Sequence, residues 1–155
     1  MRVGIGYDVH PLVAGRALVL GGVRIEHDRG LDGHSDADVL THAVIDAVLG
    51  AASLGDIGTH FPASDPRYKD ASSLEMLETA VASVREAGFR VTNVDCTVIA
   101  EEPRLGSRLE AMKANLSGRL GGAAVNVKGK SPEGIGALGR GEGIAAQAVA
   151  TIEES

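Results

Sequence analysis

Asp8 and His10 place a carboxylate and an imidazole one residue apart near the start of the sequence. Val3, Ile5 and Val9 recur at odd positions around them, which predicts a β-strand with one buried face. Side chains two positions apart on a strand point to the same side, about 7 Å apart, so Asp8 and His10 are expected to face one point in space. Such a pair alone is more often a polar strand end than a metal site, so a third ligand is needed.

His42 is the candidate third ligand, and it lies in residues 36–49, whose apolar pattern predicts an amphipathic helix. Asp38, His42 and Asp46 follow at intervals of four residues and therefore share one stripe of that helix. The alternative is a solvated polar face with His42 as a bystander, but apolar residues around the stripe leave little of the helix free to face water. We interpret Asp46, one turn beyond His42, as a partner that orients a ligand imidazole.

The composition is that of a globular protein, and the 155 residues suffice for a single domain over residues 1–155. Aromatic residues make up only 3%, so the core is expected to consist of Ala, Val, Leu and Ile. The net charge of −6 argues against nucleic acid as a partner, but not against phosphorylated ligands. Cys96 is the single cysteine, which excludes a disulfide framework. Neither a signal peptide nor an apolar run of about 18 residues is present, so we expect a cytosolic protein without a membrane partner.

Further elements follow from the same patterns. Alternation, apolar stripes and turn residues predict a hairpin around Gly21-Gly22 (residues 16–26), helices over residues 72–87 and 108–120, and strands over residues 89–100 and 124–128. Residues 144–152 fit two structures, because their Ala content favours a helix and their alternation favours a strand.

The ends of these elements carry signals of their own. Pro11 lacks an N–H group for a strand ladder and is expected to end the first strand. Ser35 or Asp36 is expected to cap the first helix, and either Ser72 (with Glu75) or Ser73 the second.

Three polar or glycine-rich segments allow a functional interpretation beside a structural one. His34 and Ser35 precede a helix N-terminus, which can seat a phosphate, although the spacing favours capping. Asp56 lies in a Gly- and Pro-rich loop, where a capping acid and a functional acid are equally consistent with the sequence. Residues 134–139 match G-x-G-x-x-G, but no helix–strand unit follows, so we interpret them as a loop rather than a dinucleotide site.

Taken together, separated motifs over the whole sequence resemble one family, the 2-C-methyl-D-erythritol 2,4-cyclodiphosphate synthases of the non-mevalonate isoprenoid pathway. The segments that carry the resemblance are Gly6-Tyr-Asp-Val-His10, Leu31-Asp-Gly-His-Ser-Asp-Ala-Asp-Val39, His42, Leu49-Gly-Ala-Ala-Ser-Leu-Gly-Asp-Ile-Gly58, Phe61-Pro-Ala-Ser-Asp-Pro66 and Gly139-Arg-Gly-Glu-Gly-Ile144. Because these motifs match in order, the signal is far more specific than any one of them.

The resemblance implies a fold and a reaction. The expected fold is α+β, a mixed four-stranded sheet packed on helices in a chorismate-mutase-like subunit, with residues 143–152 as a strand beside the first. The expected assembly is a homotrimer with active sites between subunits. The implied enzyme is a phosphorus–oxygen lyase that converts 4-diphosphocytidyl-2-C-methyl-D-erythritol 2-phosphate to the 2,4-cyclodiphosphate and CMP, in the bacterial cytoplasm. The attacking group belongs to the substrate, so no protein nucleophile is needed.

The resemblance also implies site residues. Asp8, His10 and His42 match zinc ligands, and Glu133 matches the ligand of a second cation, magnesium or manganese, on the diphosphate. His34 and Ser131 match positions that stabilise the transition state. The implied substrate contacts are Asp8, His10, His34, Ser35, Asp56, Ile57, Gly58, Phe61, Asp65, Ala100, Arg104, Leu105, Gly106, Gly129, Lys130, Ser131, Glu133, Ala137 and Arg140.

A few positions depart from the commoner family pattern. Ser131 stands where Thr is frequent and keeps the hydroxyl, and Lys130 adds a cation beside the diphosphate. Ala137 replaces an aromatic residue that often faces the threefold channel, where isoprenoid diphosphates bind in the family, whereas Arg140 keeps the cationic end of such a site.

Two other classes share part of this pattern. A zinc-dependent phosphohydrolase or cyclase for another nucleotide has the same metal ligands without the cytidine pocket. A non-catalytic trimeric metal-binding protein keeps the metal and releases no CMP. By type, three nitrogen and oxygen ligands also suit manganese or cobalt.

Overall fold

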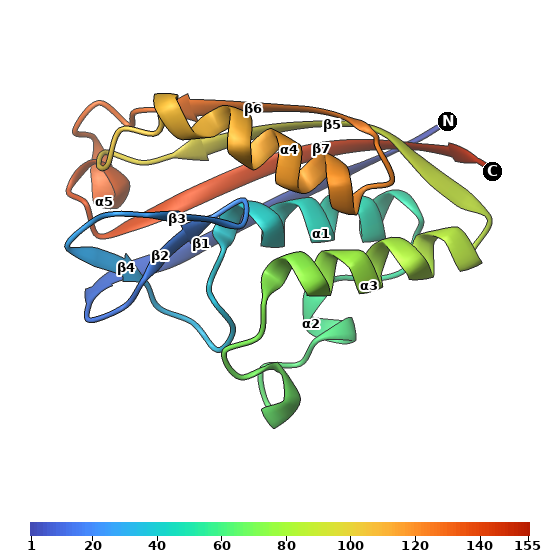
Figure 1. Ribbon diagram of the computed structural model, residues 1–155, viewed down its shortest axis with the longest axis horizontal. Coiled ribbons are helices and arrows are strands. Elements are labelled where there is room, and N and C mark those ends of the chain that lie inside the picture. The colour runs from blue at the N-terminus through green and yellow to red at the C-terminus, as the bar shows by residue number, and fades with distance from the viewer.

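A twisted mixed sheet forms one layer of the molecule, and helices cover one of its faces (Figure 1). The computed structural model describes all 155 residues. The strand order is β4-β1-β7-β5-β6, in which β5 and β6 are parallel and the other neighbours antiparallel. The strands are β1 (Arg2–Ala14), β4 (Arg29–Leu31), β5 (Phe89–Ile99), β6 (Ala124–Lys130) and β7 (Gly143–Glu154). The four long strands confirm the expected mixed sheet, and the short strand β4 extends it at the end of β1.

Three helices pack on this sheet, with α1 against β1 and β7, and α4 beside β6. Their bounds are α1 (Val39–Ala51), α3 (Ser73–Glu86) and α4 (Leu109–Arg119). Short helical turns occur at α2 (Ile57–His60), η1 (Pro66–Tyr68), η2 (Gly106–Arg108) and α5 (Gly136–Gly139). The core is mainly Ala, Val, Leu and Ile, as the composition predicts, and α1 is buried almost all round. No helix combines the length and the apolar character needed to cross a lipid bilayer.

Two glycines on β1 allow α1 to lie directly against the strand. A Cβ atom added to Gly4 would come within 2.0 Å of the Ala47 carbonyl oxygen, and one added to Gly6 within 1.8 Å of that of Ala43. No side chain larger than hydrogen fits at either position without moving the helix. The inward face of β1 therefore begins with two glycines, and the same face carries Asp8 further along.

The missing N–H group of Pro11 predicts that the first strand ends there, but β1 continues to Ala14. Pro11 is the last residue of β1 paired with β7, and from Leu12 onward the strand pairs with β4. The Pro11 carbonyl still accepts a hydrogen bond from the Asp32 N–H group at 2.9 Å. Proline is tolerated because the strand changes partner at this residue, where no ladder N–H is required.

The predicted cap of α1 is wrong, and that of α3 is right in position but not in its hydrogen bond. Asp38, not Ser35 or Asp36, caps α1, and its carboxylate accepts from the Thr41 N–H group at 3.0 Å. Ser72 occupies the cap position of α3 without a side-chain bond, so the capping box with Glu75 does not form. Asp36 instead accepts from the first N–H group of α3, that of Ser73, at 3.0 Å. A residue from a distant segment thus caps α3 in place of the neighbouring residue that local spacing predicts.

The other sequence-based elements are confirmed with small changes of length. The hairpin is formed by β2 (Leu18–Leu20) and β3 (Val23–Ile25), and both turn glycines between them have positive φ. The ambiguous C-terminal segment is strand β7, which pairs with β1 on one side and β5 on the other. Alternate side chains of β7 are buried against α1, which accounts for the period of two.

We expect Gly6→Ala to lower the free energy of unfolding by at least about 2 kcal/mol, because the added methyl group meets helix backbone that cannot rotate away. Gly118→Ala is the matched control: Gly118 lies in α4 with nothing within 4 Å of an added Cβ. There the same change should stabilise the chain by about 0.5–1 kcal/mol. Urea unfolding measures both values, and equal effects of the two substitutions would contradict the packing argument.

Candidate functional site

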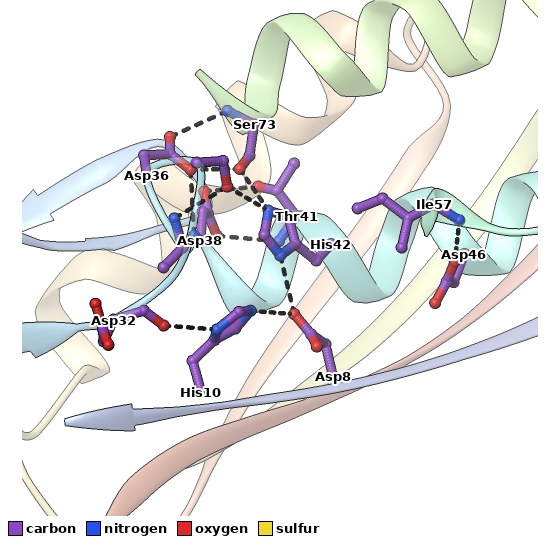
Figure 2. A network of polar contacts seen from close by, with 12 residues as sticks. Asp8, His10, Asp32, Asp36, Asp38, Thr41, His42, Asp46, Ile57 and Ser73 are labelled. Atoms are coloured by element: carbon purple, nitrogen blue, oxygen red, sulfur yellow. Dashed lines mark hydrogen bonds and ion pairs between the residues drawn. The ribbon is translucent and has the colours of Figure 1, made fainter. Parts of the chain in front are cut away.

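Asp8 and His10 on β1 and His42 on α1 converge on one point, and we call these three residues the metal triad (Figure 2). The Asp8 Oδ2 atom lies 3.0 Å from His10 Nε2 and 2.9 Å from His42 Nδ1. One ligand atom from each residue lies within 4.8 Å of the other two. His42 is buried, whereas Asp8 and His10 are partly exposed, so the point where the three side chains meet is open on one side.

The arrangement fits a divalent cation. In a tetrahedral site with metal–ligand bonds of about 2.0–2.1 Å, neighbouring ligand atoms lie about 3.3 Å apart. The two Asp8–imidazole distances in the triad are 0.3–0.4 Å shorter than that edge, so a small outward rotation of the side chains admits an ion. Three protein ligands with one open side are typical of catalytic rather than structural sites.

Electrostatics favour an ionised Asp8 carboxylate, and hydrogen bonds orient the His10 ring. Burial alone would raise the pKa of Asp8, but hydrogen bonds and charges from His10 and His42 outweigh it and lower that pKa to about 2. The hydrogen bond to Asp8 raises the pKa of His10 against the opposing effect of burial. His10 Nδ1 lies 2.8 Å from the Asp32 carbonyl oxygen, an acceptor only, so Nδ1 carries the hydrogen and Nε2 faces Asp8.

Asp46 does not orient a ligand imidazole, contrary to the interpretation from helical spacing. Its carboxylate accepts from the Ile57 N–H group at 2.8 Å and so holds the first residue of α2 (Figure 2). Burial raises the pKa of Asp46, and the Ile57 bond opposes that shift. His42 instead has two hydroxyl groups near its Nε2 atom, Ser73 Oγ at 2.8 Å and Ser35 Oγ at 3.1 Å. Ser73 lies 31 residues from His42 in sequence, so no local spacing could identify it.

A cavity of about 710 Å³ lies where the parallel strands β5 and β6 end, beside η2. We call it the β5–β6 pocket, and its lining is Val98, Ala100, Glu101, Pro103, Arg104, Leu105, Gly106, Ser107, Leu109, Gly129, Lys130 and Ser131. Its volume is that of a small-molecule site. All seven expected substrate contacts within residues 100–106 and 129–131 line it. None of the metal triad lines it, so one chain holds the triad and the pocket as separate places.

Several other expected substrate contacts lie beside the triad or in the loops beyond it. Ser35 approaches His42, as described, and His34 Nε2 lies 3.0 Å from the Asp65 carbonyl oxygen. Asp56 caps α2 and accepts hydrogen bonds from Thr59, which lower the pKa of Asp56. Phe61 is buried, with its ring centroid 5.3 Å from that of Tyr68. The capping role of Asp56 is therefore confirmed, and its contact with substrate stays a prediction.

The remaining expected contacts are exposed, except Ile57, which is partly buried. Ile57 and Gly58 belong to α2, the helical turn that Asp46 holds. Glu133 has a positive φ of 56°, a strained conformation for a residue with a side chain, and its N–H group donates to Ser131 Oγ at 3.0 Å. Ala137 belongs to α5, and Arg140 next to it forms an ion pair with Glu142 at 2.6 Å.

A triad that could hold a metal ion and a separate pocket of nucleotide size are the two candidate binding places of this chain. A family model described as the YgbB family matches residues 1–153. The chain belongs to this family.

Individual relatives agree with the family match. Proteins named 2-C-methyl-D-erythritol 2,4-cyclodiphosphate synthase are similar along nearly their whole length. The one from Bordetella avium is 59% identical over 153 residues, covering 97% of this chain and 94% of the relative. The one from Alkaliphilus oremlandii is 54% identical over 154 residues, covering 98% of each.

Solved structures of similar proteins share the fold. The bifunctional IspDF from Campylobacter jejuni superposes with a TM-score of 0.95 at 41% identity, and the match covers 99% of this chain and 42% of that longer chain. A Plasmodium falciparum IspF solved as a CDP complex superposes with a TM-score of 0.85 at 31% identity, covering 99% of this chain and 96% of that one.

We expect His42→Ala to abolish tight binding of a divalent ion, because it removes the ligand that joins α1 to β1. Asp46→Asn is the control on the same helix face, and it should retain the ion because its carboxylate serves Ile57. Calorimetric titration of the metal-free protein with zinc measures both. Loss of binding in Asp46→Asn, with His42→Ala unaffected, would reverse the assignment.

Proposed function

We propose that this chain catalyses the reaction for which its relatives are named, the formation of 2-C-methyl-D-erythritol 2,4-cyclodiphosphate with release of CMP. The observation that carries the proposal is the convergence of Asp8, His10 and His42 in a chain that matches such synthases over nearly its full length. The substrate is 4-diphosphocytidyl-2-C-methyl-D-erythritol 2-phosphate, and the reaction class is a phosphorus–oxygen lyase.

The chemistry is an intramolecular phosphoryl transfer. An oxygen of the 2-phosphate forms a bond to the β-phosphorus, the bond from that phosphorus to the CMP oxygen breaks, and an eight-membered ring closes. Two anionic groups must approach each other, so positioning and charge neutralisation are the whole problem. When bound, zinc at the metal triad and magnesium or manganese at Glu133 supply positive charge to the phosphate oxygens.

The β5–β6 pocket is proposed to hold the cytidine nucleotide. Its lining includes Ala100, Leu105 and Gly129, small or apolar residues that a flat base can contact. Arg104 and Lys130 lie at the same pocket, are exposed, and form no ion pair within the chain. These two cations are therefore available to a diphosphate, in a protein whose net charge is −6.

His34 and Ser131 are proposed to stabilise the transition state from opposite ends. Gly33, next to His34, lies against the His10 ring, with an added Cβ only 3.1 Å from its Cε1 atom, so this loop borders the metal triad. Ser131 lines the β5–β6 pocket and keeps its hydroxyl close to Glu101 at 3.3 Å. The two residues belong to separate parts of one chain, and the proposal requires that they meet in the assembled enzyme.

A homotrimer is proposed to bring those parts together. The outer face of β1 presents Val3, Ile5, Tyr7 and Val9, which are 47–76% exposed although they are large and apolar. Val149 on the adjacent β7 continues this face opposite Ile5. A contiguous apolar strand face is typical of an assembly surface. Copies packed through it would set the metal triad of one subunit beside the β5–β6 pocket of the next.

Phosphorus NMR of the substrate with the protein, zinc and magnesium tests the reaction. We expect the substrate signals to be replaced by those of a cyclic diphosphate and CMP, with no conversion after metal removal by a chelator and recovery on adding zinc. Nucleoside monophosphate without ring closure would indicate a phosphohydrolase, and an unchanged substrate would indicate a binding protein.

Mixing two inactive variants tests the shared active site. His42→Ala removes a metal ligand, and Gly129→Leu fills the β5–β6 pocket without a close backbone contact. If subunits exchange at random, half of the triads and half of the pockets are intact, so about a quarter of the sites should be active. Measured CMP release should rise on co-refolding and stay absent for each variant alone. No recovery in mixed trimers would place the complete site within one chain.

A further inference from the structure

Asp36, Ser73 and His42 form a hydrogen-bond series that ends at the metal triad (Figure 2). The Ser73 Oγ atom lies 2.8 Å from His42 Nε2, and its hydroxyl donates to the Asp36 carboxylate. The Ser73 N–H group donates to the same carboxylate at 3.0 Å, so Asp36 holds the residue by two bonds. Ser73 has no exposed surface, which excludes water as a competing partner.

The direction of these bonds follows from which atoms carry hydrogens. An ionised carboxylate only accepts, so the single hydrogen of the Ser73 hydroxyl is committed to Asp36. Ser73 Oγ can then only accept from His42, and the hydrogen in that contact must be on Nε2 of the ring. With Nε2–H used in this way, Nδ1 is the atom that faces Asp8, and a cation bound between the two groups takes the Nδ1 lone pair in place of the hydrogen that this contact otherwise shares with Asp8.

We infer that Ser73, fixed by Asp36, is a positioning residue that holds His42 with Nε2 as the donor and Nδ1 free to bind a cation. The inference rests on the metal site of the proposed function and adds two residues to it that lie on another helix and another loop. It also matches the other imidazole of the triad: His10 donates from Nδ1 to the Asp32 carbonyl and presents Nε2. In both rings, the nitrogen that does not face Asp8 thus donates to an acceptor that has no hydrogen to donate in return.

Ser35 is a weaker candidate for the same task. Its Oγ atom lies 3.1 Å from His42 Nε2 and accepts from the Ala37 N–H group at 3.2 Å, but no carboxylate takes its hydroxyl hydrogen. Ser35 can therefore donate to an unprotonated Nε2 as readily as it can accept from Nε2–H. Only Ser73 distinguishes between the two tautomers of the ring.

Zinc titration of Ser73→Ala tests the inference. The backbone N–H of residue 73 still reaches Asp36, so the start of α3 is kept while the acceptor for His42 is lost. We expect the dissociation constant for zinc to rise by roughly 10- to 100-fold. Ser83→Ala is the matched control, the same change on the same helix, where the hydroxyl contacts only the Thr79 carbonyl at 3.4 Å. It should leave the constant unchanged.

Nitrogen-15 NMR of the zinc-loaded protein gives a readout that a merely structural role would not move. In the natural chain we expect a slowly exchanging Nε2–H on His42, and in Ser73→Ala a proton that exchanges faster and resonates at higher field. Asp36→Asn, which cannot accept all three hydrogens that Asp36 receives, should act in the same direction.

The outcomes separate the inference from the proposed function. Equal zinc affinity in the natural chain and Ser73→Ala, or a ring protonated on Nδ1 with zinc bound, would overturn the role of Ser73 while CMP release is untouched. A natural chain that binds no zinc would overturn the metal site and the role of Ser73 together. Absence of CMP release with normal zinc binding would reject the reaction alone.

Discussion

The close approach of α1 to β1 is the constraint on which the site depends. Helix and strand backbones touch at Gly4 and Gly6, where any side chain would collide with helix carbonyl oxygens. If methyl groups separated the helix from the strand, His42 would lie further from Asp8, because both side chains have a fixed length. The two glycines carry no functional group, yet they set the distance between Asp8 and His42. Their effect on any activity would therefore come through packing rather than through contact with a ligand.

The start of α1 is held by a buried carboxylate that accepts hydrogen bonds from a distant segment. Asp38 has no exposed surface and accepts from the N–H groups of Gly21 and Gly22, at 2.9 and 2.8 Å, as well as from Thr41. Burial raises the pKa of Asp38, and the bonds from Thr41 and Gly22 oppose that shift. Such a group is costly to bury unless its acceptor sites are filled, as they are here. The β2–β3 turn and the first turn of α1 are consequently fixed to each other, which fixes His42 one turn further along.

What the sequence predicts well is periodic or local, and what it misses is a pairing between distant segments. Alternation at Val3, Ile5 and Val9 predicts β1, and the spacing of Asp8 and His10 predicts that both side chains face one point, where the structure also places His42. Helical spacing correctly placed Asp46 on the face of His42, but it could not show that the Ile57 N–H group would occupy its carboxylate. Likewise, Ser73 was interpreted as a possible cap, whereas its hydroxyl faces a histidine 31 residues away. Hydrogen-bond partners across the fold depend on three-dimensional packing that no local pattern encodes.

One strand serves two surfaces of this chain. Successive residues of β1 alternate between glycine or a residue of the metal triad on the inner face and a large apolar side chain on the outer face. A register shift of one residue would exchange the two sets and bury valine and isoleucine where α1 requires glycine. The same register of β1 therefore both places the metal triad and exposes the apolar outer face. A substitution that weakened the inner packing would disturb the outer face as well, because both depend on the same backbone.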